Sequence, residues 1–523
     1  MKLFSNGRIY PLEGKEHEVG AILFAGNRIA AIGERQELIE YARCLGGDLQ
    51  EYDLAGRCAL PGFIDSHTHF RQFSLNLRKL YFLGQERYED ILEGVRNYAQ
   101  GVRPGDWILG QGWNKNIWDK TPRKEDLDQA APENPVALYS KDYHTIWANS
   151  LALAKAGIDT ATPDPEGGKF VRDEEGRPTG IVRENAAKIF ASVIPEPTLE
   201  ESCLALAEGF EYAWKRGLTG IHVSEGSEAW NAYQYLRRSG KLGLRVLLMI
   251  PRLSLDNVIE LGIRSGLGDE FIRVGPLKLF VDGALGSQTA AMFEPYCGSD
   301  DRGIQVISRK ELEGLVRRAA ENGIASAIHA IGDKANHLAI NALYKVKELT
   351  DRYGLRQRVE HLQLVLPEDI ALLHEASAIA SMQPIHLPGD IANIKEYWGG
   401  RAKNSFSFRR VLQAGIPLAF GSDVPVEDLD PLRGIWAAVA RKEKKGGSGF
   451  HPEESLTVME AVKAFTLGSA YASGEETIKG SLVPGKLADM VVLDRDIFRC
   501  EPDEILDTRV DLTILDGQIV YDR

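Results

Sequence analysis

The chain has 523 residues, of which 44% are hydrophobic and 26% are charged, so we expect a globular protein of two or three structural units. Its formal net charge of −13 and its pI of about 5.5 argue against nucleic acid or an anionic membrane as the main partner. No uncharged apolar run reaches the roughly eighteen residues of a membrane span, and the five scattered cysteines contain no Cys-x-x-Cys pair. We therefore expect a cytoplasmic protein that binds neither nucleic acid nor membrane, with a homodimer left open.

The two ends of the chain share a β-rich pattern. Near the N-terminus, Gly26-Asn27 separates two short apolar segments, as the residues of a two-residue hairpin turn do. Near the C-terminus, Asp516-Gly517 takes the same position between two more such segments. The sequence therefore predicts a composite β-sandwich domain made of residues 1–58 and 478–523.

The middle of the chain, residues 59–477, alternates apolar strand candidates with helical patterns. Eight such repeats are typical of a (β/α)8 TIM barrel, so the sequence predicts an α/β fold of this kind. The strand candidates are Leu60–Ser66, Thr219–Ser224, Arg245–Ile250, Leu277–Val281, Ala325–His329, Arg358–Gln363, Ile379–Gln383 and Leu418–Ser422.

One connection in this predicted barrel is far too long. About 145 residues separate the first two strand candidates, whereas a crossover between parallel strands needs roughly a dozen. We expect an inserted subdomain over residues 71–215. Because loops that follow barrel strands lie on the active-site face, the sequence predicts that this insert covers the active site. The insert contains Trp107, Trp113, Trp118 and Trp147.

Two histidines stand at the end of the first strand candidate, in Asp65-Ser66-His67-Thr68-His69. Residues i and i+2 of a strand point to the same face, so both imidazoles can aim at one point beyond the strand. Neutral imidazole is a common ligand of Zn²⁺ and related ions, which makes this pair a candidate metal site. The alternative is a pair of surface histidines at a loop tip.

Four further residues of ligand type lie at the ends of other strand candidates, where the catalytic groups of a barrel gather. A lysine inside an apolar strand, as at Lys278, is costly unless it is paired or modified. Two of the others could be hydrogen-bonded core histidines, and Asp423 could be a turn residue, but a site that includes all of them is favoured. The four residues are Lys278, His329, His361 and Asp423.

These segments together resemble the metal-dependent amidohydrolase superfamily. The resemblance is carried by residues 61–69, by His329-Ala330-Ile331-Gly332-Asp333, by Glu360-His361 and by Gly421-Ser422-Asp423. Residues 279–290 and the long insert are similar to the YtcJ-like branch of that superfamily, which includes N-substituted formamide deformylase. The tail, residues 480–493, is similar to the return of the chain into the β-sandwich of the superfamily.

The resemblance implies one or two divalent metal ions, with zinc as the expected metal. In this arrangement His67, His69 and Asp423 bind the first ion, and His329 and His361 hold the second. Lys278 would react with CO₂ to give a carbamate that bridges the two ions. A metal-activated hydroxide would then attack a small-molecule substrate, with Asp423 as the general base and then as the general acid.

Four other residues are candidates for substrate binding. His144, in the insert, resembles a motif of the branch and could contact the substrate or an oxyanion; a structural histidine is the alternative. Trp113 could stack on the substrate or belong to the core of the insert. His222 ends the second strand candidate, where orienting a ligand fits better than binding a metal. Asp282 could support the site from behind or cap a helix.

The function that the sequence predicts is hydrolysis of a non-peptide carbon–nitrogen bond in a linear amide or N-substituted formamide. The alternatives are deamination of a cyclic amidine and hydrolysis of an ester or lactone at the same site. The sequence after His329 has no His-x-x-Glu pattern, which argues against the deaminase. A more distant alternative is a non-catalytic regulator on this fold, although such a protein should have lost ligands, and all six positions are filled.

Overall fold

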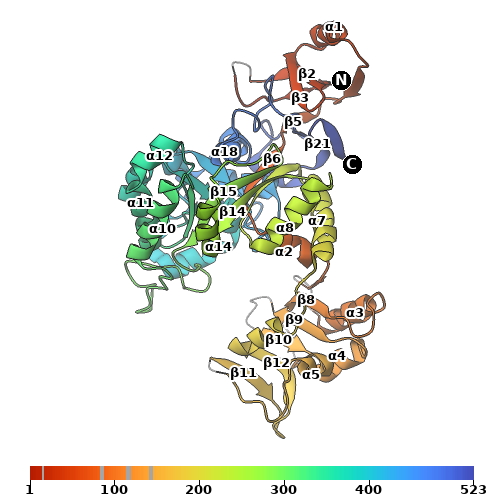
Figure 1. Ribbon diagram of the computed structural model, residues 1–523, viewed down its shortest axis with the longest axis vertical. Helices are drawn as coiled ribbons and strands as arrows, with labels where there is room; N and C mark the ends of the chain where they lie inside the picture. The colour runs from red at the N-terminus through yellow and green to blue at the C-terminus, as the bar shows by residue number, and fades with distance from the viewer. Residues whose placement is uncertain (15–16, 83–86, 114–117, 119, 141–144, 166) are drawn as a thin grey trace. The chain divides into compact units, whose positions relative to one another are not determined.

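The computed structural model describes every residue except 15–16, 83–86, 114–117, 119, 141–144 and 166 (Figure 1). The chain forms two compact units. The first comprises Met1–Phe70 together with Phe210–Arg523, and the second comprises Arg71–Gly209. Among the described residues, none of the helices is long and apolar enough to cross a membrane.

The two ends of the chain pair in one eight-stranded sheet of the first unit. Strand β5 runs antiparallel to β20, with Leu60 opposite Val491, and so joins N-terminal to C-terminal residues. The order is β22-β21-β20-β5-β1-β2-β3, with β4 paired to β1. The strands are β1 (Lys2–Ile9), β2 (Val19–Ala25), β3 (Arg28–Gly33), β4 (Gln50–Asp53), β5 (Cys58–Pro61), β20 (Met490–Leu493), β21 (Val510–Leu515) and β22 (Gln518–Asp522).

Both predicted hairpin turns are confirmed. Ala25 pairs with Arg28 across Gly26-Asn27, and Leu515 pairs with Gln518 across Asp516-Gly517. Asp516 and Gly517 both have positive φ, as a two-residue turn between twisted strands requires. One face of this sheet buries a core that includes Phe4, Phe24 and Ile514, and helix α1 (Arg35–Leu45) packs with Leu3 and Leu23.

The predicted barrel is present as a sheet of eight parallel strands. Its order is β19-β18-β17-β16-β15-β14-β13-β6, so each strand lies beside the next one along the chain. The first and last strands meet where Asp423 N donates to His67 O at 2.8 Å and His69 N donates to Val424 O at 2.8 Å. The strands are β6 (Phe63–Thr68), β13 (Leu218–Val223), β14 (Arg245–Pro251), β15 (Ile272–Phe280), β16 (Ser326–Ala330), β17 (Arg358–His361), β18 (Ile379–Met382) and β19 (Leu418–Phe420).

The first barrel strand begins three residues later than the apolar run predicts. Leu60 and Pro61 belong to β5 of the terminal sheet, and β6 begins at Phe63. Gly62 lies between the two strands, where an added Cβ would come within 2.3 Å of Thr219 Cγ2. One continuous apolar run thus contributes a strand to each of two sheets. Hydrophobicity by itself does not show the boundary between these two strands.

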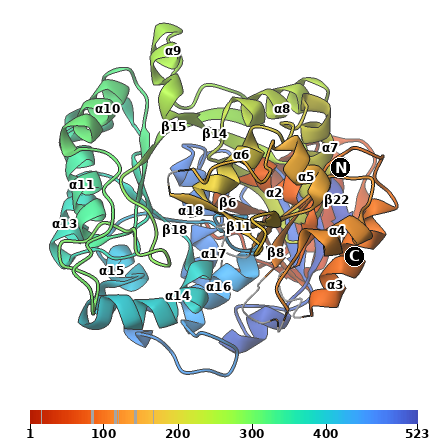
Figure 2. The ribbon, with the colours of Figure 1, turned by 90° about the horizontal axis from the view of Figure 1, so that it is seen from below.

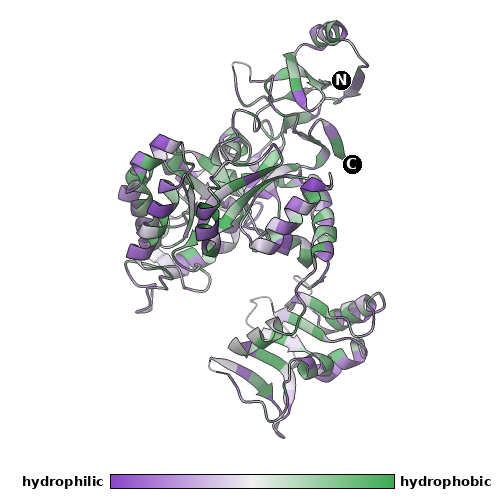
Figure 3. Ribbon diagram, viewed as in Figure 1, coloured by the Kyte–Doolittle hydropathy of each residue, from purple (hydrophilic) through white to green (hydrophobic). Residues whose placement is uncertain are grey.

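Helices surround the barrel strands, as the view in Figure 2 shows for α10, α11 and α13. The buried residues of α10, among them Leu312, Val316 and Ala319, recur at the spacing of one helix face. Figure 3 shows hydrophobic and hydrophilic residues mixed along these helices. The principal helices are α8 (Ser227–Arg238), α10 (Arg309–Glu321), α11 (Asp333–Tyr344), α12 (Lys347–Tyr353), α13 (Pro367–Glu375), α14 (Leu387–Asn393), α15 (Phe408–Gln413), α16 (Pro431–Ala440), α17 (Val458–Ala464) and α18 (Leu467–Ala472).

The second unit is built on a six-stranded sheet in the order β11-β12-β10-β9-β8-β7. One of its cores contains the buried rings of Trp113 and Trp147, and the other contains Phe170 and Phe190. Its elements are β7 (Leu80–Tyr81), α3 (Tyr88–Ala99), β8 (Ile108–Trp113), α4 (Lys124–Ala130), β9 (Val136–Ser140), β10 (Thr145–Ala148), α5 (Ser150–Lys155), β11 (Gly168–Arg172) and β12 (Pro178–Glu184).

Candidate metal centre

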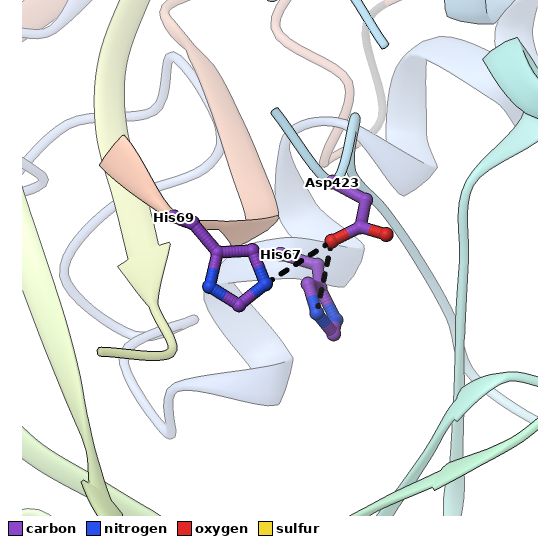
Figure 4. Close-up of side chains that lie close together, drawn as sticks. All are labelled: His67, His69 and Asp423. Atoms are coloured by element: carbon purple, nitrogen blue, oxygen red, sulfur yellow. Dashed lines mark ion pairs between the residues drawn. The ribbon is translucent and has the colours of Figure 1, made fainter. Parts of the chain in front are cut away.

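Three side chains converge where the barrel closes (Figure 4). Asp423 Oδ1 lies 3.5 Å from His67 Nε2 and 3.4 Å from His69 Nε2. One ligand atom from each residue lies within 4.8 Å of the others, and in the described part of the chain this is the one such group of histidine, cysteine and acidic side chains. His67 and Asp423 are buried, while the His69 side chain is 31% exposed. Two imidazole nitrogens and a carboxylate oxygen with this spacing fit a divalent metal such as Zn²⁺.

The backbone explains why these residues meet. His67 is the next-to-last residue of β6, and His69 follows the strand with its side chain on the same side. Asp423 follows β19 with a φ of +62°, a left-handed conformation that is uncommon for residues other than glycine. Gly421 lies so close to β6 that an added Cβ would be 2.6 Å from His67 N.

Asp65 fastens the first strand to the segment that carries Asp423. Its carboxylate accepts hydrogen bonds from Ser422 N at 3.0 Å and from His67 N at 3.1 Å. Burial raises the pKa of Asp65 to about 7, against the effect of these hydrogen bonds. Sequence reasoning missed this residue. The signal that could have found it is its position two residues before His67, on the same face of the strand.

Lys278, on β15, is buried with 4% exposure, and its Nζ has no hydrogen-bond partner in the described part of the chain. The Nζ atom lies 4.8 Å from the centre of the Phe280 ring. Burial lowers the pKa of Lys278 to about 8. Burying an amine without a hydrogen-bond partner is costly, so a role in packing alone does not explain Lys278, as the sequence suggested.

His329 and His361 lie beside the three converging residues. The ring centre of His361 is 5.0 Å from that of His67 and 4.4 Å from that of His329. The Nε2 atom of His329 lies 3.0 Å from Gly283 O, and the Nδ1 atom of His361 has no hydrogen-bond partner among the described residues. Burial lowers the pKa of both imidazoles, so both are neutral, the form in which histidine binds metals.

A second carboxylate faces His67 from the interior of the barrel. Glu360 Oε2 lies 2.6 Å from His67 Nδ1, and both side chains are almost fully buried. Burial is the largest single effect on the pKa of Glu360 and would raise it, but the charges of Arg358, His67 and Lys278 and the hydrogen bond to His67 together hold this pKa well below its ordinary value. The carboxylate is therefore ionised.

The structure places the other predicted site residues in different surroundings. Trp113 is buried in the second unit, where its indole nitrogen donates to Leu138 O at 2.7 Å. His222 is buried at the end of β13, with Nδ1 2.9 Å from Arg358 Nη1. His144 lies outside the described residues. Substrate contacts of these residues remain predictions.

Asp282 organises the loops that follow β15 and β16. Its carboxylate accepts hydrogen bonds from Ala291 N at 2.9 Å, Gly332 N at 2.8 Å and Ile331 N at 3.1 Å. Its Oδ1 also lies 3.5 Å from His329 Nε2. This carboxylate can thus support a candidate ligand, while its predicted contact with substrate stays a prediction.

His386 is a neighbour of the centre that sequence reasoning left aside. Its Nε2 lies 3.2 Å from Ser422 O and 3.9 Å from Asp423 Oδ2. The available signal was its place just after β18, among the strand ends where the other candidates occur.

A parallel eight-stranded barrel that gathers histidines and an aspartate at the carboxyl ends of its strands has the architecture of a barrel metal hydrolase. The chain belongs to the amidohydrolase family, whose model matches residues 50–521.

Several known proteins are similar along the whole chain. YtcJ of Bacillus subtilis (strain 168) is 32% identical over 541 residues, which cover 100% of this chain and 99% of that protein. N-substituted formamide deformylase of Arthrobacter pascens is 27% identical over 99% of this chain and 98% of its own length. The crystal structure of an uncharacterized metal-dependent hydrolase from Pyrococcus furiosus has a TM-score of 0.80 and 29% identity, and covers 95% of this chain and 100% of its own. The predicted family resemblance is confirmed, and the protein is a hydrolase that acts on carbon–nitrogen bonds.

Proposed function

We propose that this enzyme hydrolyses the carbon–nitrogen bond of a linear amide or N-substituted formamide of small size. The observation that carries the proposal is the convergence of His67, His69 and Asp423 at the closure of the barrel. The likeness to N-substituted formamide deformylase supports this class of substrate. Zinc is the metal that best suits two imidazoles and a carboxylate, although related ions accept the same donors.

We further propose a second metal ion, held by His329 and His361. The buried Nζ of Lys278, without a hydrogen-bond partner among the described residues, supports its conversion to a carbamate. The ammonium group would lose one proton to become a neutral amine, form a bond from its nitrogen to the carbon of CO₂ and lose a second proton, so that a cation becomes a carbamate anion with two oxygen donors. Such a group could bridge the two ions.

The residues of this chain have definite tasks in the proposed reaction. When bound, the metal supplies the Lewis acidity that makes water nucleophilic near neutral pH and polarises a carbonyl. Asp423 accepts the proton of the attacking water and then delivers it to the departing nitrogen, which is a poor leaving group without it. Of the two histidines, His69 is the more exposed, at 31% of its side chain against 1% for His67. His144 and Trp113 remain proposed substrate contacts in this scheme.

The proposal also includes the domain arrangement of the chain and its location in the cell. Residues 1–58 and 478–523 would form a β-sandwich domain, and residues 59–477 the catalytic barrel with its insert over 71–215. The antiparallel pairing of β5 with β20 supports the first assignment. The scattered cysteines favour the cytoplasm, as in other proteins that need no disulfides.

Metal analysis together with a hydrolysis screen tests this function. Purified enzyme should contain between one and two equivalents of divalent metal and should hydrolyse N-formyl or N-acyl amines faster than cyclic amides. His67→Ala should lose metal and activity together, whereas His17→Ala, a change at an exposed histidine of the terminal sheet region, should keep both. Full activity in metal-free enzyme would refute the proposal, and faster hydrolysis of cyclic amides would change the substrate class.

A further inference from the structure

The two ring nitrogens of His67 face two different carboxylates. Nδ1 lies 2.6 Å from Glu360 Oε2, and Nε2 lies 3.5 Å from Asp423 Oδ1. Glu360 belongs to β17, on the inside of the barrel, whereas Asp423 lies at its open end after β19. One nitrogen is thus engaged by the interior of the barrel, and the other points toward the candidate metal centre (Figure 4).

Glu360 is itself held by Arg358, two residues earlier on β17. The Nε and Nη2 atoms of Arg358 both donate to the carboxylate of Glu360, the second at 3.2 Å. Both side chains are 0% exposed. Because a guanidinium has donors only, these two hydrogen bonds hold the carboxylate in one orientation and leave Oε2 able to accept from His67.

Arg358 also reaches the neighbouring strands. Its Nη2 donates to the carbonyl of Ser66, the residue before His67, and to Ser381 Oγ at 2.8 Å. Its Nη1 donates to His222 Nδ1 at 2.9 Å. One side chain on β17 therefore joins β6, β13 and β18, including the backbone that carries the first candidate ligand. A shift of Arg358 would move Glu360 and the end of β6 together.

These contacts select the tautomer of His67. Both oxygens of the Glu360 carboxylate accept hydrogen bonds from the permanently charged guanidinium of Arg358, so toward His67 this carboxylate is the acceptor. A neutral His67 must then carry its proton on Nδ1 and keep the lone pair of Nε2 free. That lone pair is directed toward His69 and Asp423. A buried ion pair is weak support for stability, because the cost of desolvation can exceed the attraction of the charges. Orientation of a ligand is the better explanation of this pair.

We propose that Arg358 and Glu360 are positioning residues that hold His67 as the Nδ1-protonated tautomer and so set the metal affinity of the centre. The proposal rests on the proposed function, in which His67 binds the first ion. Glu360 contacts His67 directly and Arg358 holds Glu360, so both act through the imidazole. Carboxylates in this position typically change metal affinity by about 10- to 100-fold.

Zn²⁺ affinity, measured by competition with a chromogenic chelator on purified protein without substrate, is the first test. Glu360→Gln keeps the volume of the side chain but removes its charge, and should weaken Zn²⁺ binding by about 10- to 100-fold. Ser381→Ala is the matched control, because it removes one contact of Arg358 without touching Glu360 or His67, and should bind Zn²⁺ as the wild type does. Equal affinity of Glu360→Gln and wild type would overturn the proposal.

A double variant decides the matter if Glu360→Gln does not fold. Arg358→Met with Glu360→Leu replaces both charges by apolar side chains of similar size, a change that buried ion pairs often tolerate. This variant should melt cooperatively as metal-free protein and yet bind Zn²⁺ at least about 10-fold more weakly than wild type. A folded double variant with wild-type affinity would overturn the proposal.

The tautomer itself can be observed. In metal-free protein with ¹⁵N-labelled histidine, the signals that disappear in His67→Gln should show a protonated Nδ1 and an unprotonated Nε2. A protonated Nε2 would contradict the inference even if metal affinity responds to Glu360. A wild-type protein that binds no Zn²⁺ would refute the proposed function. The inference about Arg358 and Glu360 would then still be decided by the tautomer of His67.

Discussion

Gly421 shows most directly how packing positions the candidate metal ligands. Its φ is not in the left-handed region, so an alanine could adopt this backbone without strain. The obstacle is space: an added Cβ would lie 2.6 Å from His67 N, 2.7 Å from Asp65 Oδ1 and 3.1 Å from His67 Cβ. Gly421→Ala must therefore push β6 and the segment after β19 apart.

The size of the effect follows from these distances. Ordinary contact begins at 3.4 Å, so the backbone of His67 and the carboxylate of Asp65 must each move by most of an ångström. Overpacking of a buried site by one methyl group costs about 1–3 kcal/mol of stability. A displacement of about 1 Å in a catalytic constellation can lower kcat/KM by about 10²-fold.

Three measurements on purified Gly421→Ala check this expectation: the thermal midpoint of the metal-free protein, the affinity for Zn²⁺ and kcat/KM. All three should fall. Gly314→Ala is the matched control, because Gly314 lies in helix α10 with nothing within 4 Å of an added Cβ. That change should raise stability by about 0.5–1 kcal/mol and leave activity unchanged. Wild-type metal affinity and activity in Gly421→Ala would refute the steric explanation.

Two other predictions concern the proton carrier Asp423 and Glu460, whose carboxylate accepts a hydrogen bond from Thr457 N in the cap at the start of α17. Asp423→Asn should keep the fold but lower kcat by about 10²- to 10⁴-fold, and near-normal turnover with metal bound would remove Asp423 as the proton carrier. Hydrogen bonds from Arg409 lower the pKa of Glu460 to about 2, so the ionised carboxylate stabilises the folded state above its ordinary pKa of 4.5. That stabilisation is lost as the pH falls from 4.5 toward 2. Glu460→Gln should therefore lower the thermal midpoint at neutral pH, and the difference from wild type should shrink as the pH falls through this window. A difference in thermal midpoint that does not change with pH would contradict the prediction.

Local features of the sequence were sufficient for the elements and for two of the three residues of the centre, and the family resemblance added Asp423. The apolar runs and the helical patterns between them predicted eight parallel strands in sequential order, because hydrophobic periodicity reports burial directly. The turns at Gly26-Asn27 and Asp516-Gly517 were predictable because only a few residue types tolerate their backbone angles. The spacing of His67 and His69 placed both side chains on one side of a strand end.

Local sequence patterns do not show which residues far apart in the chain come into contact; the closure of the barrel decides this. Closure of the barrel brings Asp423 to His67, and it makes Asp65 a link between the first and last strands. The role of Arg358 was hidden for the same reason, since nothing near it in the sequence shows that its side chain reaches other strands inside the barrel. Strand propensity and the alternation of side chains depend on a few neighbouring residues. Which residue pairs with a buried charge depends instead on how the whole sheet closes.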